Sequence, residues 1–395
     1  MSFTHGLTIT ESTSGARPIV PASLAVIGLV ATSFAIGNSE SDAAIEARFP
    51  LNKPVLITGN VDAAAGQAGS GGTLKAALTA IGDQATPVVV VLRVAPGEGE
   101  TDAEIAEDQD ANVIGNTDGN TYTGLQALLV AEQQLGVRPR ILGCPGLDSQ
   151  AVTAELVTIA KKLRAFAYAA AQGDTIAEAV TYRGEFSDRE LMLIWPGTNA
   201  DFEGDIIARA LGLRARIDEQ QGWHKTISNV ALGGITGMNR DVHFELIDPS
   251  TDAGVLNAAQ VTTIIRQNGY RLWGNRTCAG EDQPEFAFES AVRTSHALQD
   301  EIARIVAPFL DQPMTIGLIK DLLETGNARF RQLVAEQRIV GAEMFFDQTL
   351  NSPQELAAGR PTFRIQFTPA APIENPRVQL VITDFYYTGF ADLLV

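Results

Sequence analysis

Histidine and cysteine are scarce in this chain of 395 residues, which contains four histidines and two cysteines. Cys144 and Cys278 lie far apart and form no CxxC pair, so the sequence offers no disulfide framework and a reducing cytoplasm is the simplest compartment. No two histidines have the spacing of metal ligands, and neither a GxSxG nor an HExxH motif occurs. We therefore predict no catalytic residue, no metal site and no cofactor.

Positive charge is also scarce, because 29 Lys and Arg residues stand against 47 Asp and Glu residues, a net charge of −18. Nucleic acids and anionic membranes bind basic surfaces, so this balance argues against both as general partners. The uncharged stretch 18–39 contains a strictly apolar run only at 24–31, which is too short to span a bilayer. No basic residue precedes Arg17, so we predict a buried strand there, not a secretory signal.

Two segments come close to ligand-binding motifs without completing them. Residues 66–73, GQAGSGGT, follow a strand-like run and precede a helix, but Gly72 stands where a phosphate loop needs lysine. Residues 108–119 begin with calcium-ligand side chains but lack the glycine and the final glutamate of a calcium loop. We interpret the first segment as a turn and the second as a solvated acidic loop.

Up to about residue 250, strand-like and helix-like segments alternate, which predicts a layered α/β domain over 23–250. Helical patterns are clearest at 123–136 and at 149–172, where Gly173 should end the helix. The strand-like segments are near-continuous apolar runs, typical of a parallel sheet buried on both faces. These runs are residues 23–31, 54–59, 87–94, 138–146 and 190–197.

After about residue 250 helices come first and antiparallel-looking strands later, which indicates a second, α+β domain over 251–375. Residues 257–268 predict a helix that stops at Gly269 and is followed by a strand. Two long helices are then predicted at 290–309 and 313–338. Three strand-like runs complete the chain, at 339–347, 361–369 and 377–387.

Both ends of the chain alternate apolar and polar residues with the period of a half-buried strand. Leu7 and Ile9 alternate with threonines near the start, as Val378, Leu380 and Ile382 alternate with other residues near the end. Proline-rich segments separate both from the rest, so we predict extended arms at 1–22 and 376–395. Both strands could also pair within their own subunit.

The second long helix carries a basic stripe that is unusual in so acidic a protein. At 100° per residue, Lys320, Arg331 and Arg338 fall within a narrow arc together with Asn327. Glu324 lies close enough to dilute this charge. Two interpretations stay open, an ordinary solvated face and an electrostatic contact to an acidic partner.

Blocks along nearly the whole chain resemble the contractile-tail sheath protein of small temperate myophages, and R-type pyocin sheaths are similar. The blocks occur in the family's order and are MSFTHGLTITESTSGARPI, FPLNKPVLITGN, YTGLQALL, RPRILGCPG, QGWHKTISNV, NGYRLWGNRTC and PIENPRVQLVITDFYYTGFADLL. The resemblance implies a structural subunit that is not an enzyme. It would polymerise as stacked hexameric rings around a tail tube and contract to drive the tube through the host envelope.

The resemblance also implies an outer α/β domain, an inner α+β domain against the tube, and terminal arms that add strands to neighbouring subunits. The implied partners are further copies of the chain, the tail tube protein, and baseplate and tail-terminator proteins, with assembly in the host bacterial cytoplasm and a final place in the virion tail. The implied tube contact is Lys320, Arg329 and Arg331, of which Arg329 lies outside the basic arc. The implied inter-subunit strands contain Leu7, Thr8, Ile9, Thr10, Val378, Leu380, Ile382 and Phe385.

Two alternatives remain at this point. One is the sheath of a tail-only particle such as an R-type pyocin. The other is a soluble α/β enzyme, which an intact phosphate loop would have supported. A single chain of this length favours a phage or pyocin sheath over the sheath of a secretion system, which resembles two paired chains.

Overall fold

The computed structural model describes residues 24–37 and 41–388. A six-stranded sheet, with the order β2-β3-β1-β6-β7-β8, forms the centre of the larger body. All neighbours are parallel except β2, which runs antiparallel to β3 at one edge. The mixed α/β class predicted from the sequence is confirmed. The strands are β1 (Ile27–Thr32), β2 (Pro54–Ile57), β3 (Val89–Val94), β6 (Ile141–Gly143), β7 (Phe166–Ala170) and β8 (Leu191–Ile194).

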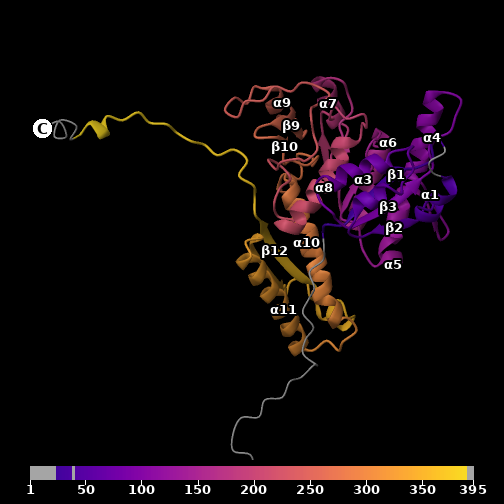
Figure 1. Ribbon diagram of the computed structural model, residues 1–395. Coiled ribbons are helices and arrows are strands. Elements are labelled where there is room, and N and C mark those ends of the chain that lie inside the picture. Colours follow the sequence, from indigo (N-terminus) through magenta and orange to yellow (C-terminus); the bar gives the residue numbers. More distant parts are fainter. Residues whose placement is uncertain (1–23, 38–40, 389–395) are drawn as a thin grey trace, which may run out of the picture.

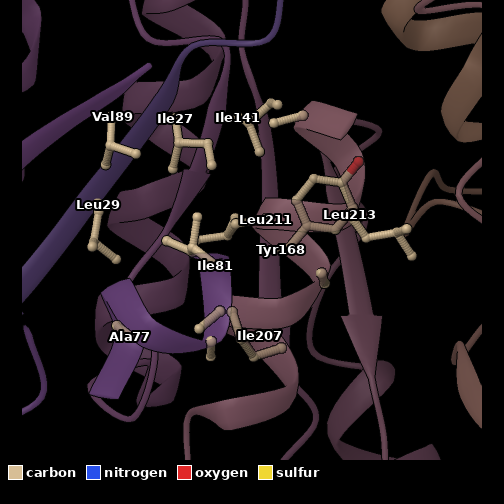
Figure 2. Packing of buried hydrophobic residues seen from close by; sticks show 14 of the residues in the cluster. Ile27, Leu29, Ala77, Ile81, Val89, Ile141, Tyr168, Ile207, Leu211 and Leu213 are labelled. Atoms are coloured by element: carbon tan, nitrogen blue, oxygen red, sulfur yellow. The ribbon is translucent and has the colours of Figure 1, made fainter. Parts of the chain in front are cut away.

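Helices bury both faces of this sheet, since alternate residues of each strand enter two different hydrophobic cores. Figure 2 shows one face, where Ile81 of α3 (Leu74–Gly82) and Ile207 and Leu211 of α8 (Asp205–Gln220) pack against β1, β3 and β6. The helix α2 (Val61–Ala65) extends this core. The other face is covered mainly by η1 (Gly124–Val130), α5 (Ala131–Leu135) and α6 (Gln150–Leu163), with single buried residues from α4 (Asp102–Ile114) and α7 (Ile176–Arg183).

The helix predicted at 149–172 is confirmed only as far as Leu163. The helix α6 ends at Leu163, and Arg164 adopts a left-handed conformation with φ of 52°. The alanine-rich residues 166–170 then form the inner strand β7, which pairs with β6 and β8. Alternating aromatic and alanine residues fit the period of a helix as well as that of a strand. The strand forms because it is buried at the centre of the sheet.

The helix predicted at 257–268 is also wrong. A short helix, α9 (Asp252–Ala258), is followed by a hairpin of β9 (Thr263–Arg266) and β10 (Tyr270–Trp273). Asn268 and Gly269 turn the hairpin with φ values of 52° and 98°. Such Asn-Gly turns match the twist of paired strands, so Gly269 closes a hairpin where a helix stop was expected.

The first part of the acidic segment predicted as a loop, residues 108–114, is helical instead. It lies in α4, where Thr101 and Glu104 form a capping box at the first turn. The remaining small elements of the body are α1 (Asp42–Arg48), the two-residue strands β4 (Thr117–Asp118) and β5 (Thr121–Tyr122), and η2 (Pro284–Phe286).

A separate lobe follows, and Figure 1 shows α10 running from the body into it beside α11 and β12. The lobe contains α10 (Glu289–Val306), η3 (Ala307–Phe309), α11 (Ile316–Ala335), β11 (Ile339–Phe346), α12 (Pro353–Ala357) and β12 (Phe363–Pro369). All of these except α12 were predicted to within a few residues. Its core buries Leu322, Phe330 and Leu333 of α11 against Leu298 and Ile305 of α10. Within the described residues, no helix is both long and apolar enough to cross a membrane.

Hydrophobic packing assigns α9 and the hairpin β9–β10 to the body. Leu256, Ile264, Leu272 and Cys278 lie in its two cores, whereas the core of the lobe is built mainly from α10 and the elements after it. Val292 of α10 still lies in a core of the body, and Ala297 is the first residue of α10 in the core of the lobe, so hydrophobic packing divides the chain within α10. The division predicted at 250 stays a prediction.

Buried ion pairs join α10 to the body. Glu289, fully buried, accepts hydrogen bonds from Arg214 (3.0 Å) and from the hydroxyl of Tyr168 (2.5 Å). One turn later, Arg293 pairs with Asp218, which also binds Arg214 at 2.8 Å. We call these five residues the buried ion cluster. Because each charge in it has an opposite partner, it fixes the direction in which α10 leaves the body.

Candidate assembly surfaces

The C-terminal segment leaves the folded part as an extended, exposed chain (Figure 1). Val378, Leu380 and Ile382, predicted to form one face of a strand, expose 83, 93 and 102% of their surfaces. Within the described residues, 370–384 form neither a strand nor a bridge, and Phe385 opens the short η4 (Phe385–Tyr387). Among the described residues, no strand pairs with this alternating apolar pattern, which stays exposed.

The predicted N-terminal strand, Leu7, Thr8, Ile9 and Thr10, lies outside the described residues. The first described residue, Leu24, is buried in the core of the lobe together with Trp223 and residues of α10. The described chain therefore starts next to the lobe, although its next residues continue into β1 of the body.

The strands β11 and β12 form a two-stranded sheet, which depends on the packing of α11 for its stability. Phe363, Ile365 and Phe367 of β12 point toward the core of the lobe but are only half-buried. Additional strands would bury them further. The sheet is therefore incomplete in the sense that it leaves these three side chains half-buried.

The two edges of this sheet differ. On the outer edge of β11, the side chain of Asn327 accepts a hydrogen bond from the backbone N–H of Met344 (2.8 Å) and donates one to its carbonyl (2.9 Å). Met344 faces Ile365, so this is a non-hydrogen-bonded pair and the N–H and C=O of Ile365 also point away from the partner strand. On β12 no described strand pairs along that edge, and an unpaired edge is a template for another strand.

The structure separates the three predicted tube-contact residues of α11. Lys320 is exposed, and Arg331, also exposed, pairs with Glu324 at 2.6 Å. Arg329 faces α10, where it binds Glu301 at 2.9 Å with only 13% of its side chain exposed. The exposed basic surface of α11 is thus Lys320 and Arg331, partly neutralised by Glu324.

Sequence reasoning missed an ion pair at the base of the C-terminal segment. Arg276 donates two hydrogen bonds to the carboxylate of Glu374, from Nε at 2.8 Å and from Nη2 at 2.6 Å. The partners lie 98 residues apart, and no local pattern connects them. Arg276 lies in NGYRLWGNRTC and Glu374 in the proline-rich segment, so only tertiary structure brings them together.

A hollow of about 580 Å³ lies at the carboxyl ends of β6, β7 and β8, where α/β enzymes bind ligands. Burial raises the pKa of Asp148 there to about 6, although the backbone N–H of Ala170 donates to its carboxylate at 2.5 Å. Ser149 beside it binds Asp110 at 2.7 Å. The described residues that line this hollow include no histidine to pair with the serine.

The glycine-rich segment 66–73 closes against the end of β1. The N–H groups of Gly69 and Gly71 donate to the hydroxyl of Ser33 (3.1 Å) and the carbonyl of Phe34 (3.0 Å). A Cβ atom on Gly69 would lie 2.2 Å from that carbonyl, which explains the glycine. Since these N–H groups bind protein oxygens, they cannot hold a phosphate, and the interpretation as a turn is confirmed. Among the described residues, no group of His, Cys, Asp and Glu side chains could hold a metal ion.

Comparison with solved structures shows which fold this is. The sheath complex of an extracellular contractile injection system, PVC, in its contracted state aligns with a TM-score of 0.68 at 14% identity, covering 98% of this chain and 99% of that one. The helical sheath of the anti-feeding prophage in its contracted state aligns with a TM-score of 0.66 at 16% identity, covering 97% and 100%.

Sequence relatives are much closer. The tail sheath protein of Escherichia phage P2 is 45% identical over 393 residues, which are 97% of this chain and 96% of the relative. The major tail sheath protein of Serratia phage KSP20 is 42% identical, covering 99% and 98%. Residues 120–278 match the central domain of the phage tail sheath protein family. With these matches along nearly its whole length, the chain belongs to the phage tail sheath protein family, a family of structural tail proteins and not of enzymes.

Proposed function

We propose that this protein is the subunit of a contractile tail sheath and polymerises as stacked hexameric rings around a tail tube. On contraction the sheath drives the tube through the host envelope. The partners are further copies of the chain, the tube protein, and baseplate and terminator proteins, and the sheath assembles in the host cytoplasm before the tail is complete. The same mechanics would serve a tail-only particle.

The observation that carries this proposal is the exposed alternating segment beside an incomplete sheet. In the lattice, Val378, Leu380 and Ile382 add as a strand to the β11–β12 sheet of a neighbour, along the free edge of β12. The N-terminal strand, Leu7 to Thr10, is a second donor. Because donor and acceptor are different surfaces, each subunit can pass the contact on, and such contacts build filaments.

The energetics favour exchange only when many subunits take part. Burying three apolar side chains contributes about 5–9 kcal/mol in total. Ordering the five residues 378–382 costs about 5–10 kcal/mol. A single exchanged strand is therefore close to neutral, which fits a monomer that stays soluble until a lattice adds further contacts.

We assign the lobe, from α10 to β12, to the tube side and the body to the outside. The predicted limits, 23–250 for the outer domain and 251–375 for the inner one, then shift so that 251–288 lie outside. Contraction releases a metastable extended lattice into one that buries more subunit surface, and the arms keep neighbours connected throughout.

Replacing Leu380 with aspartate tests the donated strand directly. We expect the minimum protein concentration for polymer formation to rise about tenfold or more, since the variant loses the burial of one leucine. Gln379→Asp is the matched control, because it adds the same charge one residue away on the opposite face of the strand. Light scattering and negative-stain microscopy measure both, and equal effects at the two positions would contradict the proposal.

Reversing the charges of Lys320 and Arg331 to glutamate tests the tube contact. Exposed ion pairs contribute about 0.2–1 kcal/mol each, but here they repeat in every subunit. We expect fewer extended tails, with tube-free polymers of the contracted form unaffected. Lys53→Glu with Arg240→Glu, on the body, makes the same change in net charge as a control. Unchanged yields of extended tails, counted by microscopy, would remove these residues from the tube contact.

A further inference from the structure

The C-terminal segment is attached to its own subunit before it becomes free. After β12 ends at Pro369, residues 370–374 run along the body beside Lys225, Trp273 and Asn275. The two hydrogen bonds from Arg276 to Glu374 lie at the end of this stretch. The guanidinium of Arg276 also lies 5.2 Å from the centre of the Phe288 ring, a cation–π contact that helps to hold it in place.

Packing contributes little to this attachment. A hollow of about 450 Å³ lies between residues 370–374 and the body. A second, of about 740 Å³, lies beyond Glu374 and reaches Pro376 and Val378. Ile373, the largest apolar side chain of the stretch, is 87% exposed. Residues 370–374 also form no strand or bridge, so the ion pair is the main interaction that holds them.

We propose that Arg276 and Glu374 form a releasable clasp that sets where the C-terminal arm leaves its subunit. With the clasp closed, the arm begins at residue 375. With the clasp open, residues 370–374 join the arm and extend its reach by up to about 17 Å. The role of the clasp in the lattice rests on the proposed strand exchange, whereas its existence in the subunit does not.

The clasp is suited to release because water reaches it. Each partner exposes 36% of its side chain, whereas Arg214 and Glu289 of the buried ion cluster are fully buried. Charges that remain solvated after separation are cheap to separate, and salt screens their attraction. The prolines of PAAPIENP keep the released residues extended, so the released segment lengthens the distance that the arm can span. Such a device lets the arm follow a neighbour whose distance changes during contraction.

Distance measurements by electron paramagnetic resonance test the clasp in the full-length monomer. Nitroxide labels on Ile373→Cys and Val255→Cys report on the stretch, since both positions are exposed and the native Cys144 and Cys278 are buried. We expect one narrow distance distribution in the parent and one about twofold wider in Glu374→Gln, because a released segment samples chain-like distances. About 1 M salt should widen the parent distribution in the same way.

Swapping the two charged residues distinguishes the loss of the ion pair from a general effect of substitution. Arg276→Glu combined with Glu374→Arg should restore the narrow distribution, and Arg377→Gln, three residues on, should leave it unchanged. A Glu374→Gln distribution as narrow as the parent, or an exchanged pair as wide as the single variant, would overturn the clasp. Circular dichroism melting confirms that each variant is folded.

The labelled chain, assembled on tubes, tests release during contraction. We expect the narrow distribution in extended tails and the wide one after contraction, and equal widths in both would overturn release. A chain that ends at residue 376 keeps the clasp and loses the donated strand. If that chain still forms long tubes, the strand exchange fails while the monomer result for the clasp stands.

Discussion

Deleting residues 377–395 is expected to give a folded monomer that forms no long tubes. The described part of this segment adds nothing to the three hydrophobic cores, and Leu380, Ile382 and Tyr386 are each more than 80% exposed. The melting temperature of the subunit should therefore stay within a few degrees of the parent. Polymerisation should fail, because the acceptor sheet of every neighbour lacks its added strand.

Negative-stain microscopy at rising protein concentration measures this outcome, and circular dichroism confirms the fold. Deleting residues 1–12 is the companion experiment, since it removes the predicted N-terminal strand and leaves the C-terminal one. Normal polymers from both truncated chains would end the strand-exchange proposal.

Mixing provides a sharper form of the same prediction. The chain without residues 377–395 still has the free edge of β12, so it accepts a strand from a neighbour but donates none at its C-terminus. Small amounts added to the full-length protein should shorten the polymers, because a contact passed from subunit to subunit stops at each defective copy. Polymers of unchanged length that exclude the truncated chain would mean that its acceptor sheet is not used.

The sequence predicted those elements whose hydrophobic pattern fits only one kind of secondary structure. The valine-rich run that forms β3 has no helical alternative, and five of the six strands of the large sheet were expected where they occur. β7 was missed because its alternating alanines fit a continuation of the preceding helix as well as they fit a strand. Of the hairpin β9–β10 only the second strand was predicted, and β9 was missed although Asn268 and Gly269 gave a turn signal.

The assembly surfaces were predictable only where a pattern within one segment of the sequence marks them. The alternation around Leu380 is such a pattern, and the basic stripe on α11 is another. Helical geometry could not show that Arg329 points to Glu301, nor that Asn327 covers the edge of β11 at Met344, since both depend on how α11 packs. The sequence placed the donor strand, and only the structure distinguished the free edge from the covered one.

Replacing Glu289 with glutamine is expected to lower the free energy of unfolding by about 3–5 kcal/mol, the usual effect of removing one partner from a buried ion pair. Arg214, fully buried, would keep Asp218 as its only anionic partner and share it with Arg293. Glu285→Gln is the control, since that side chain is exposed four residues earlier. Urea unfolding of the monomer measures both variants.

The pH dependence of this loss identifies its cause. Burial alone would raise the pKa of Glu289, but Arg214 and Arg293 outweigh burial and hold the pKa below its ordinary value. A carboxylate with a lowered pKa stabilises the fold above its unfolded pKa, and this stabilisation is lost as the pH falls through the folded pKa. The deficit of Glu289→Gln should therefore be largest near neutral pH and shrink below about pH 4. A deficit that does not change with pH would point to lost packing instead, and the direction of α10 would then have to be fixed by the hydrophobic contacts of its first turns.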